Sequence, residues 1–231
     1  MKKIRMIAAA LAALALVTLV GCRRNVPASP EELFKQNTPQ PAATAVPRST
    51  EDNSDDYTAE KKEKIGRSLV IYFSATGCTE NVAQAIARLM SADIYRISPA
   101  YPYSEADLDY NDPSSRAVLE QADPECRPNI IGSLPVTEGY DYIFIGYPIW
   151  CGEAPKIVYT LVESIELGEA TVIPFCTSGS SEIGESADHL RSSALGGLWI
   201  QGKRLYGSIT DKELVEWLAS CVPANAIAGV N

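Results

Sequence analysis

From residue 66 onward, β-rich apolar runs alternate with helical patterns, and this alternation limits the possible folds more than any other feature. The first run, "SLVIYF" at 68–73, is apolar almost throughout, which is typical of a strand covered on both faces. Further runs lie at 92–98, 141–148, 170–178 and near 198–205, and helical patterns lie at 80–90, 154–165, 181–194 and 210–220. The order predicts an α/β fold, a doubly wound five-stranded parallel sheet with helices on both faces, in a three-layer sandwich.

The first 22 residues have the pattern of a secretory signal. Lys2, Lys3 and Arg5 precede an apolar run over 6–20, which is short for a membrane-spanning helix. The sequence "LVGC" at 19–22 resembles the lipobox of bacterial lipoproteins, which implies a lipidated Cys22 that anchors the chain to the outer face of a membrane. The alternative is a plain signal peptide, and both alternatives predict an extracytoplasmic protein.

Residues 23–66 are rich in Pro, Ala, Ser, Thr and charged residues and contain few large apolar ones. Such a composition predicts a disordered tether with a reach on the order of 35 Å. The predicted organisation is therefore a lipoprotein signal peptide at 1–22, a tether at 23–66 and one folded domain at 67–231.

The folded part is acidic. Residues 66–231 carry 10 Lys and Arg against 21 Asp and Glu, a net charge of −11. This balance disfavours nucleic acid as a partner and favours a protein with a basic docking face.

The loop after the first strand, "SATGCT" at 74–79, has the features of an anion site without a cation. Ser74, Thr76 and Thr79 supply hydroxyls, Gly77 permits a tight turn, and a helix begins directly afterwards. A phosphate monoester suits such a site. The alternative is a Ser/Thr-rich turn that only caps the helix.

Two other phosphate-binding motifs are excluded by their missing residues. A nucleoside-triphosphate P-loop requires G-x-x-x-x-G-K-[ST], which this loop lacks. A cysteine phosphatase loop built on Cys78 requires an arginine at position 84, which is Gln84.

Two further loops follow the third and fourth strands, where ligands bind in doubly wound sheets. In "GYPIWCGEAP" at 146–155, Tyr147 and Trp150 are expected to be exposed and to stack on a planar ring. The alternative is a tryptophan packed back onto its own sheet. The loop "CTSGSSEIGES" at 176–186 offers backbone groups for the edge of a heteroaromatic ring.

Taken together, the three loops resemble those of the flavodoxin-like superfamily, in the variant with a P-x-W-x-G middle loop. The resemblance rests on S-x-T-G-x-T at 74–79, G-Y-P-I-W-x-G at 146–152 and C-T-S-G at 176–179. It implies non-covalent FMN as the cofactor. The residues implied for the phosphate are Ser74, Thr76, Gly77, Cys78 and Thr79, and those implied for the ring are Tyr147, Pro148, Ile149, Trp150, Gly152, Thr177, Ser178 and Gly179.

The sequence departs from this pattern at Cys151, where relatives often carry a second large aromatic residue, so a thinner stacking face and weaker FMN binding are expected. The uncharged phosphate loop and the acidic domain also imply a lowered reduction potential. No catalytic residue or metal ligand is predicted, and His189 is expected at the surface.

The function expected from these features is FMN-dependent electron transfer between redox protein partners at the outer face of a bacterial membrane. One alternative is an FMN-dependent NAD(P)H or quinone oxidoreductase. A second alternative is a flavin-free scaffold that keeps the fold in order to bind a partner.

Overall fold

The structure is a computed structural model, and it describes residues 66–228. The predicted signal peptide, almost all of the predicted tether and Cys22 lie outside the described residues. Within the described part, no helix is both long enough and apolar enough to cross a membrane.

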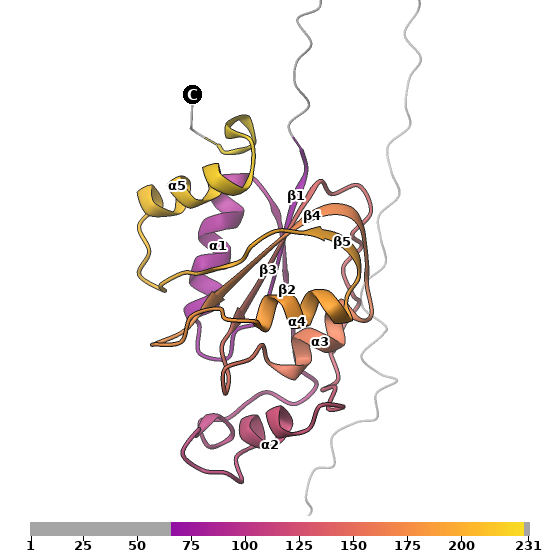
Figure 1. The fold of residues 1–231 in the computed structure, drawn as a ribbon, viewed down its shortest axis with the longest axis vertical. Coiled ribbons are helices and arrows are strands. Elements are labelled where there is room, and N and C mark those ends of the chain that lie inside the picture. The colour runs from indigo at the N-terminus through magenta and orange to yellow at the C-terminus, as the bar shows by residue number, and fades with distance from the viewer. Residues whose placement is uncertain (1–65, 229–231) are drawn as a thin grey trace, which may run out of the picture. The chain divides into compact units, whose positions relative to one another are not determined.

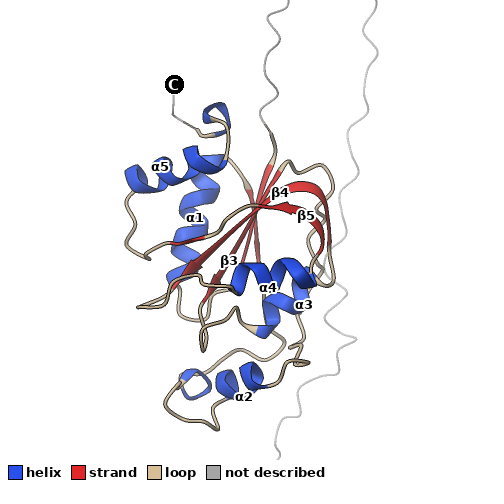
Figure 2. Ribbon diagram, in the orientation of Figure 1, coloured by secondary structure: helices blue, strands red, loops and turns tan. Residues whose placement is uncertain are grey.

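A parallel sheet forms the centre of the domain (Figures 1 and 2). Its strands follow the order β2-β1-β3-β4-β5, and a short β6 pairs with β4 beyond the end of β5. The strands are β1 (Ser68–Tyr72), β2 (Asp93–Arg96), β3 (Tyr142–Pro148), β4 (Glu166–Thr177), β5 (Leu195–Trp199) and β6 (Lys203–Arg204). The predicted fold class is confirmed, and the order is that of the flavodoxin-like fold.

Helices cover both faces of this sheet, as Figure 1 shows. Helices α1 and α5 lie on one face, and α3 and α4 lie on the other, while α2 belongs to the long connection between β2 and β3. The α-helices are α1 (Cys78–Met90), α2 (Arg116–Ala122), α3 (Lys156–Val162), α4 (Ser186–Ser193) and α5 (Asp211–Cys221), and short 3₁₀ helices occur at η2 (Ala106–Leu108) and η3 (Ala224–Ala226).

The central strands are buried on both sides because their residues alternate between two apolar clusters. Val70, Phe144 and Ile173 pair across β1, β3 and β4 and pack under α1 and α5. Ile71 and Ile145 point to the opposite face, into the cluster that contains α3. This packing explains why the strands read as continuous apolar runs.

Several predicted boundaries shift in the structure. The fourth strand begins at Glu166 rather than at residue 170, and its first part pairs with β5 through a register shift near Gly168. The predicted fifth strand near 198–205 is divided into β5 and β6. Thr210 caps α5 as predicted, in a capping box with Glu213.

Candidate functional site

The loops after β1, β3 and β4 meet at Thr177, the last residue of β4. The Oγ1 atom of Thr177 lies 2.8 Å from Oγ1 of Thr79, in a hydrogen bond whose donor can be either hydroxyl. The carbonyl of Thr177 accepts a hydrogen bond from the N–H of Ile149 at 3.2 Å. These two bonds connect three segments that are far apart in the sequence, and they confirm that the three predicted loops come together.

The first loop places uncharged donors at the start of α1. Ser74 is buried, and its Oγ accepts a hydrogen bond from the N–H of Gly77 at 3.1 Å. Gly77 has φ +90°, and the helix begins at the next residue. The first bond of the helical pattern runs from the N–H of Asn81 to the carbonyl of Gly77, so the three N–H groups before Asn81 precede the helical ladder. They lie at the positive end of the helix dipole, which favours an anion.

The side chains of this loop differ in exposure. Thr79 is buried and bonded to Thr177, whereas Thr76 and Cys78 are exposed. One hydroxyl of the Thr79–Thr177 pair therefore keeps a hydrogen that it can donate elsewhere.

Each of the three loops has one open side. A Cβ atom built on Gly77, Gly152 or Gly179 would meet no heavy atom within 4 Å. Uncharged donors therefore border free space at the carboxyl ends of the strands. The group that the motifs imply, a phosphate monoester attached to a planar ring, fits this arrangement at its phosphate end.

The expectation of exposed stacking aromatics is wrong. Trp150 is 2% exposed, and its ring lies edge-on to Phe73 and Tyr103, with centroid distances of 5.4 and 4.9 Å. Tyr147 is fully buried, and its hydroxyl lies 3.1 Å from Oγ of Ser186. The alternative, a tryptophan packed back onto its own sheet, is the one that the structure has.

A tight turn explains why Trp150 points inward. The N–H of Trp150 donates to the carbonyl of Glu153 at 2.8 Å, and the N–H of Glu153 donates back at 3.0 Å. The two residues between them, Cys151 and Gly152, both have positive φ, at 50° and 86°. The turn therefore presents Cys151 and Gly152 at its tip, while Pro148 and Ile149 at its base are half-buried.

The turn is also connected to α4. Nδ1 of His189 lies 2.9 Å from Oε1 of Glu153, and the two side chains are 50% and 35% exposed. His189 lies at the surface, as predicted, but its partner Glu153 belongs to the loop after β3. Burial and the nearby Glu153 raise the pKa of Tyr159, which also contacts this carboxylate, to about 12.

Hydrogen bonds from Ser178 and Arg204 hold the third loop, which follows β4. Oγ of Ser178 accepts hydrogen bonds from the N–H groups of Ser180 and Ser181, at 3.3 and 2.9 Å. The side chain of Arg204, from β6, donates to the carbonyls of 178–180. Arg204 is not among the predicted site residues, because it lies in a short strand far along the chain and belongs to none of the three loop motifs.

The model of the flavodoxin family matches residues 67–221, which is most of the described domain. The chain belongs to the flavodoxin family. No curated protein matched it.

Solved structures agree with this membership. A Bacteroides eggerthii protein classed as a flavoprotein is 41% identical, with a TM-score of 0.63, over 68% of this chain and 98% of its own. A second such protein, from Bacteroides uniformis, is 39% identical, with a TM-score of 0.64, over 68% and 99%. A Lactobacillus acidophilus flavoprotein in complex with FMN is 22% identical, with a TM-score of 0.50, over 66% and 99%, and it shows the shared fold.

In this member of the flavodoxin family, the exposed aromatics near the site are tyrosines that the motifs did not indicate. Tyr110, from the β2–β3 connection, is 51% exposed, and its pKa is raised by partial burial and, to a smaller extent, by the nearby Cys151. Tyr206, after β6, is 58% exposed and lies against Arg204. The only sequence signal for either is an aromatic residue in a loop after a predicted strand.

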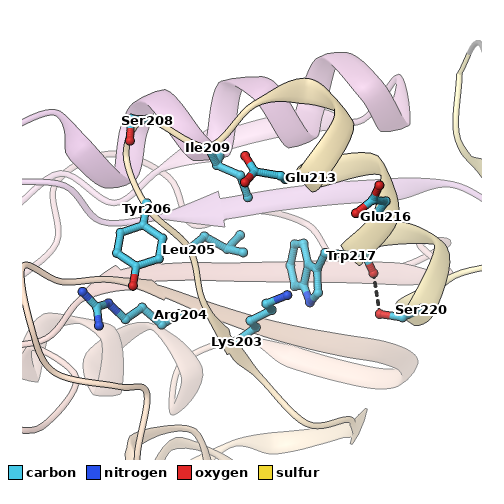
Figure 3. Close-up of a pocket in the computed structure, with 10 residues that line it drawn as sticks. All are labelled: Lys203, Arg204, Leu205, Tyr206, Ser208, Ile209, Glu213, Glu216, Trp217 and Ser220. Atoms are coloured by element: carbon cyan, nitrogen blue, oxygen red, sulfur yellow. Dashed lines mark hydrogen bonds between the residues drawn. The ribbon is translucent and has the colours of Figure 1, made fainter.

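A cavity of about 460 Å³ lies beside the site, between the segment after β6 and α5 (Figure 3). Lys203 and Arg204 line it together with Glu213 and Glu216. Because the opposite charges balance, the lining gives no preference for an anion. Among the described residues, no group of His, Cys, Asp and Glu side chains is arranged to hold a metal ion.

Proposed function

We propose that this flavodoxin-family chain binds FMN and transfers electrons between redox proteins at the outer face of a bacterial membrane, to which lipidated Cys22 tethers it. The observation that carries the proposal is the junction at Thr177, where the three loops meet next to the uncharged start of α1. The sequence pattern at 1–22 supports the export and the tether.

The phosphate end of the cofactor is assigned to residues 74–79. Backbone N–H groups of the first turn of α1 and the hydroxyls of Ser74, Thr76 and Thr79 supply the donors. A helix start with several neutral donors can hold a phosphate dianion without a lysine or arginine. FMN, when bound, supplies the electron chemistry, and the chain supplies binding, orientation and electrostatics.

The ring end is assigned mainly to backbone. Since Tyr147 and Trp150 are buried, the ring is expected to rest on the turn at 149–152 and on Thr177, Ser178 and Gly179. Gly152 and Gly179 permit close approach because neither has a side chain and both face open space. With no aromatic face from 147 or 150, we expect weaker FMN binding than a stacked site gives.

The acidic domain supports a carrier role. Residues 66–231 carry 21 acidic against 10 basic residues, and a complementary basic partner would be attracted at long range. The loops that border the site follow this trend, with Glu105, Asp107, Asp109 and Asp112 on the β2–β3 side and Glu182 and Glu185 on the β4–α4 side.

The proposal is tested by the absorption spectrum of protein purified without added flavin, followed by an FMN titration. We expect a flavin spectrum, or its appearance on titration, and at least tenfold weaker FMN binding when Thr76 and Thr79 are both changed to alanine. Riboflavin, which lacks the phosphate, is the matched ligand, and its affinity should fall much less, because only the Thr79–Thr177 bond connects these hydroxyls to the ring end. A folded double variant that binds FMN like the parent would refute the assigned phosphate site.

Two further measurements test the role and the location. Slow reduction of the bound flavin by NAD(P)H without oxygen supports the carrier, whereas rapid reduction supports an oxidoreductase. Membrane fractionation of cells that express the parent or Cys22→Ser tests the anchor, and release of only the variant from the membrane fraction supports it.

A flavin-free scaffold is the second candidate, and the buried Trp150 and the exposed Cys151 favour it. A colourless protein that takes up neither FMN nor riboflavin would establish this candidate in place of the first.

A further inference from the structure

Arg204 directs all of its hydrogen-bonding capacity at the loop after β4. Its Nε and Nη2 donate to the carbonyl of Ser178 at 3.2 and 3.1 Å, and Nη2 also donates to the carbonyl of Gly179 at 3.0 Å. Its Nη1 donates to the carbonyl of Ser180 at 3.1 Å and to Oε1 of Glu182 at 3.2 Å. These five bonds match the five N–H donors of a guanidinium group, whose planar fork a lysine cannot reproduce.

The guanidinium is enclosed even though it belongs to a surface strand. The side chain of Arg204 is 8% exposed, and its central carbon lies 4.5 Å from the centre of the Tyr206 ring. Figure 3 shows the two side chains next to each other, with Tyr206 on the segment that leaves β6 toward α5. Among residues 66–228, Glu182 supplies the one carboxylate bonded to this cation, and it is 75% exposed, so solvent weakens its effect.

The bonds from Arg204 fix which groups of the loop point outward. The carbonyls of residues 178–180 are directed toward the guanidinium, and Oγ of Ser178 occupies the N–H groups of Ser180 and Ser181. Within the described residues, the N–H of Gly179 has no partner, and the Cα of Gly179 faces open space. At Gly179 the loop thus offers a backbone N–H and an open surface to a ligand.

We infer that Arg204 is a positioning residue for the ring end of the proposed flavin site, and that it also places a positive charge behind the loop at 178–180. This inference rests on the proposed FMN function. It changes the expectation that the ring lacks a nearby cation, which the first loop alone suggests. A fixed cation at this place stabilises the anionic reduced flavin and raises its reduction potential, against the effect of the acidic domain.

The experiment separates the fork geometry from the charge. Arg204→Lys keeps the charge without the fork, and Arg204→Met keeps neither. Arg127 is the matched control, because it also donates to two backbone carbonyls and to a carboxylate, that of Glu163, but joins the β2–β3 connection to α3. Dissociation constants for FMN and riboflavin and the reduction potential of bound FMN are measured in all variants, together with the unfolding temperature.

We expect both Arg204 variants to bind FMN and riboflavin about tenfold more weakly, because the ring end is common to the two ligands. The reduction potential should fall in Arg204→Met and stay near the parent value in Arg204→Lys. Arg127→Lys and Arg127→Met should change the unfolding temperature but neither affinity nor potential.

Parent-like flavin affinity in Arg204→Met overturns the inference, and so does a loss that affects FMN but spares riboflavin. An affinity loss of the same size in the Arg127 variants also overturns it, because the effect is then one of general stability. A parent protein that binds neither flavin refutes the proposed function itself, and that result is distinct from parent binding with unchanged Arg204 variants.

Discussion

The two ends of the candidate site are built in different ways. The phosphate end consists of six consecutive residues, 74–79, and its defining bond joins Ser74 to Gly77, three residues away. The ring end is assembled from the turn at 150–153, the loop at 178–182 and Arg204 of β6. The first depends on local stereochemistry and the second on tertiary packing, so they should respond differently to substitution.

The largest change in stability is expected for Trp150→Ala. This substitution distinguishes a role of Trp150 in core packing from a role in contacting the ligand. Because its ring is buried against Phe73 and Tyr103, we expect Trp150→Ala to lower the free energy of unfolding by about 3–5 kcal/mol. The neighbouring Cys151 is exposed, so Cys151→Ser should change this free energy by less than about 0.5 kcal/mol. Urea denaturation of both variants provides the measurement.

The opposite result for Trp150→Ala would show that Trp150 belongs to the binding site. If Trp150→Ala keeps the stability of the parent but loses riboflavin and FMN affinity, the tryptophan contacts the ring rather than the core. The ring end would then be a stacking site after all.

How much the sequence predicts follows the same division. The apolar runs identify the fold, because a strand covered on both faces has few polar residues. The contiguous motif at 74–79 locates the start of α1 to within two residues, since the helix begins at Cys78 rather than after Thr79. The orientation of Trp150 is not predictable in this way, because a two-residue turn with positive φ at Cys151 and Gly152 decides it. The role of Arg204 is not predictable either, because the four atoms that accept its five hydrogen bonds belong to residues 178–182, which become its neighbours only when β6 pairs with β4.

A substitution at Gly77 tests the phosphate end of the site, which depends on local stereochemistry. Its φ of +90° is unfavourable for any residue with a side chain, whereas the space around it is open, so Gly77→Ala adds conformational strain without a clash. We expect a loss of about 1–2 kcal/mol in unfolding free energy and weaker FMN binding, with riboflavin binding unchanged.

Gly179→Ala is the matched control at the other end of the site. Gly179 also faces open space but does not have positive φ. The unfolding free energy of Gly179→Ala should therefore stay within about 0.5 kcal/mol of the parent value. Equal destabilisation by the two substitutions would show that positive φ is not what distinguishes the first loop.

The two ends of the site also contain cysteines that differ in burial, and this difference predicts a pH dependence of stability. Cys78, in the loop after β1, is exposed, whereas Cys176, near the end of β4, is buried, and burial, with a smaller contribution from Glu182, raises the pKa of its thiol to about 12. Because the folded pKa exceeds the ordinary value of 9.0 for a cysteine thiol, the folded state holds this proton more tightly. The resulting stability is fully present below about pH 9 and is lost as the pH rises toward 12.

We therefore expect Cys176 to contribute a fall of about 1 kcal/mol in the free energy of unfolding between pH 9 and 10, in addition to the fall from tyrosines whose pKa burial raises. Cys176→Ala should remove this part of the pH dependence, and Cys78→Ala should keep it. Urea denaturation at pH 8, 9 and 10 measures the difference. A slope that is the same in all three proteins would show that Cys176 ionises as readily in the folded chain as in the unfolded one.

The smallest expected effect belongs to His189, whose contact with Glu153 joins the ring turn to α4. Both side chains are partly exposed, and ion pairs or hydrogen bonds of this kind contribute about 0.2–1 kcal/mol, so His189→Ala should change stability by less than about 1 kcal/mol. Its effect on riboflavin and FMN affinity should be below about threefold and equal for the two ligands, because only the ring end is touched. Arg191→Ala, which removes an exposed contact to Asp188 on the same helix, is the control and should leave both affinities unchanged. A large affinity loss in His189→Ala alone would mean that the turn at 150–153 is held mainly by this side-chain contact, and that its two backbone bonds between Trp150 and Glu153 do not suffice to fix the ring end.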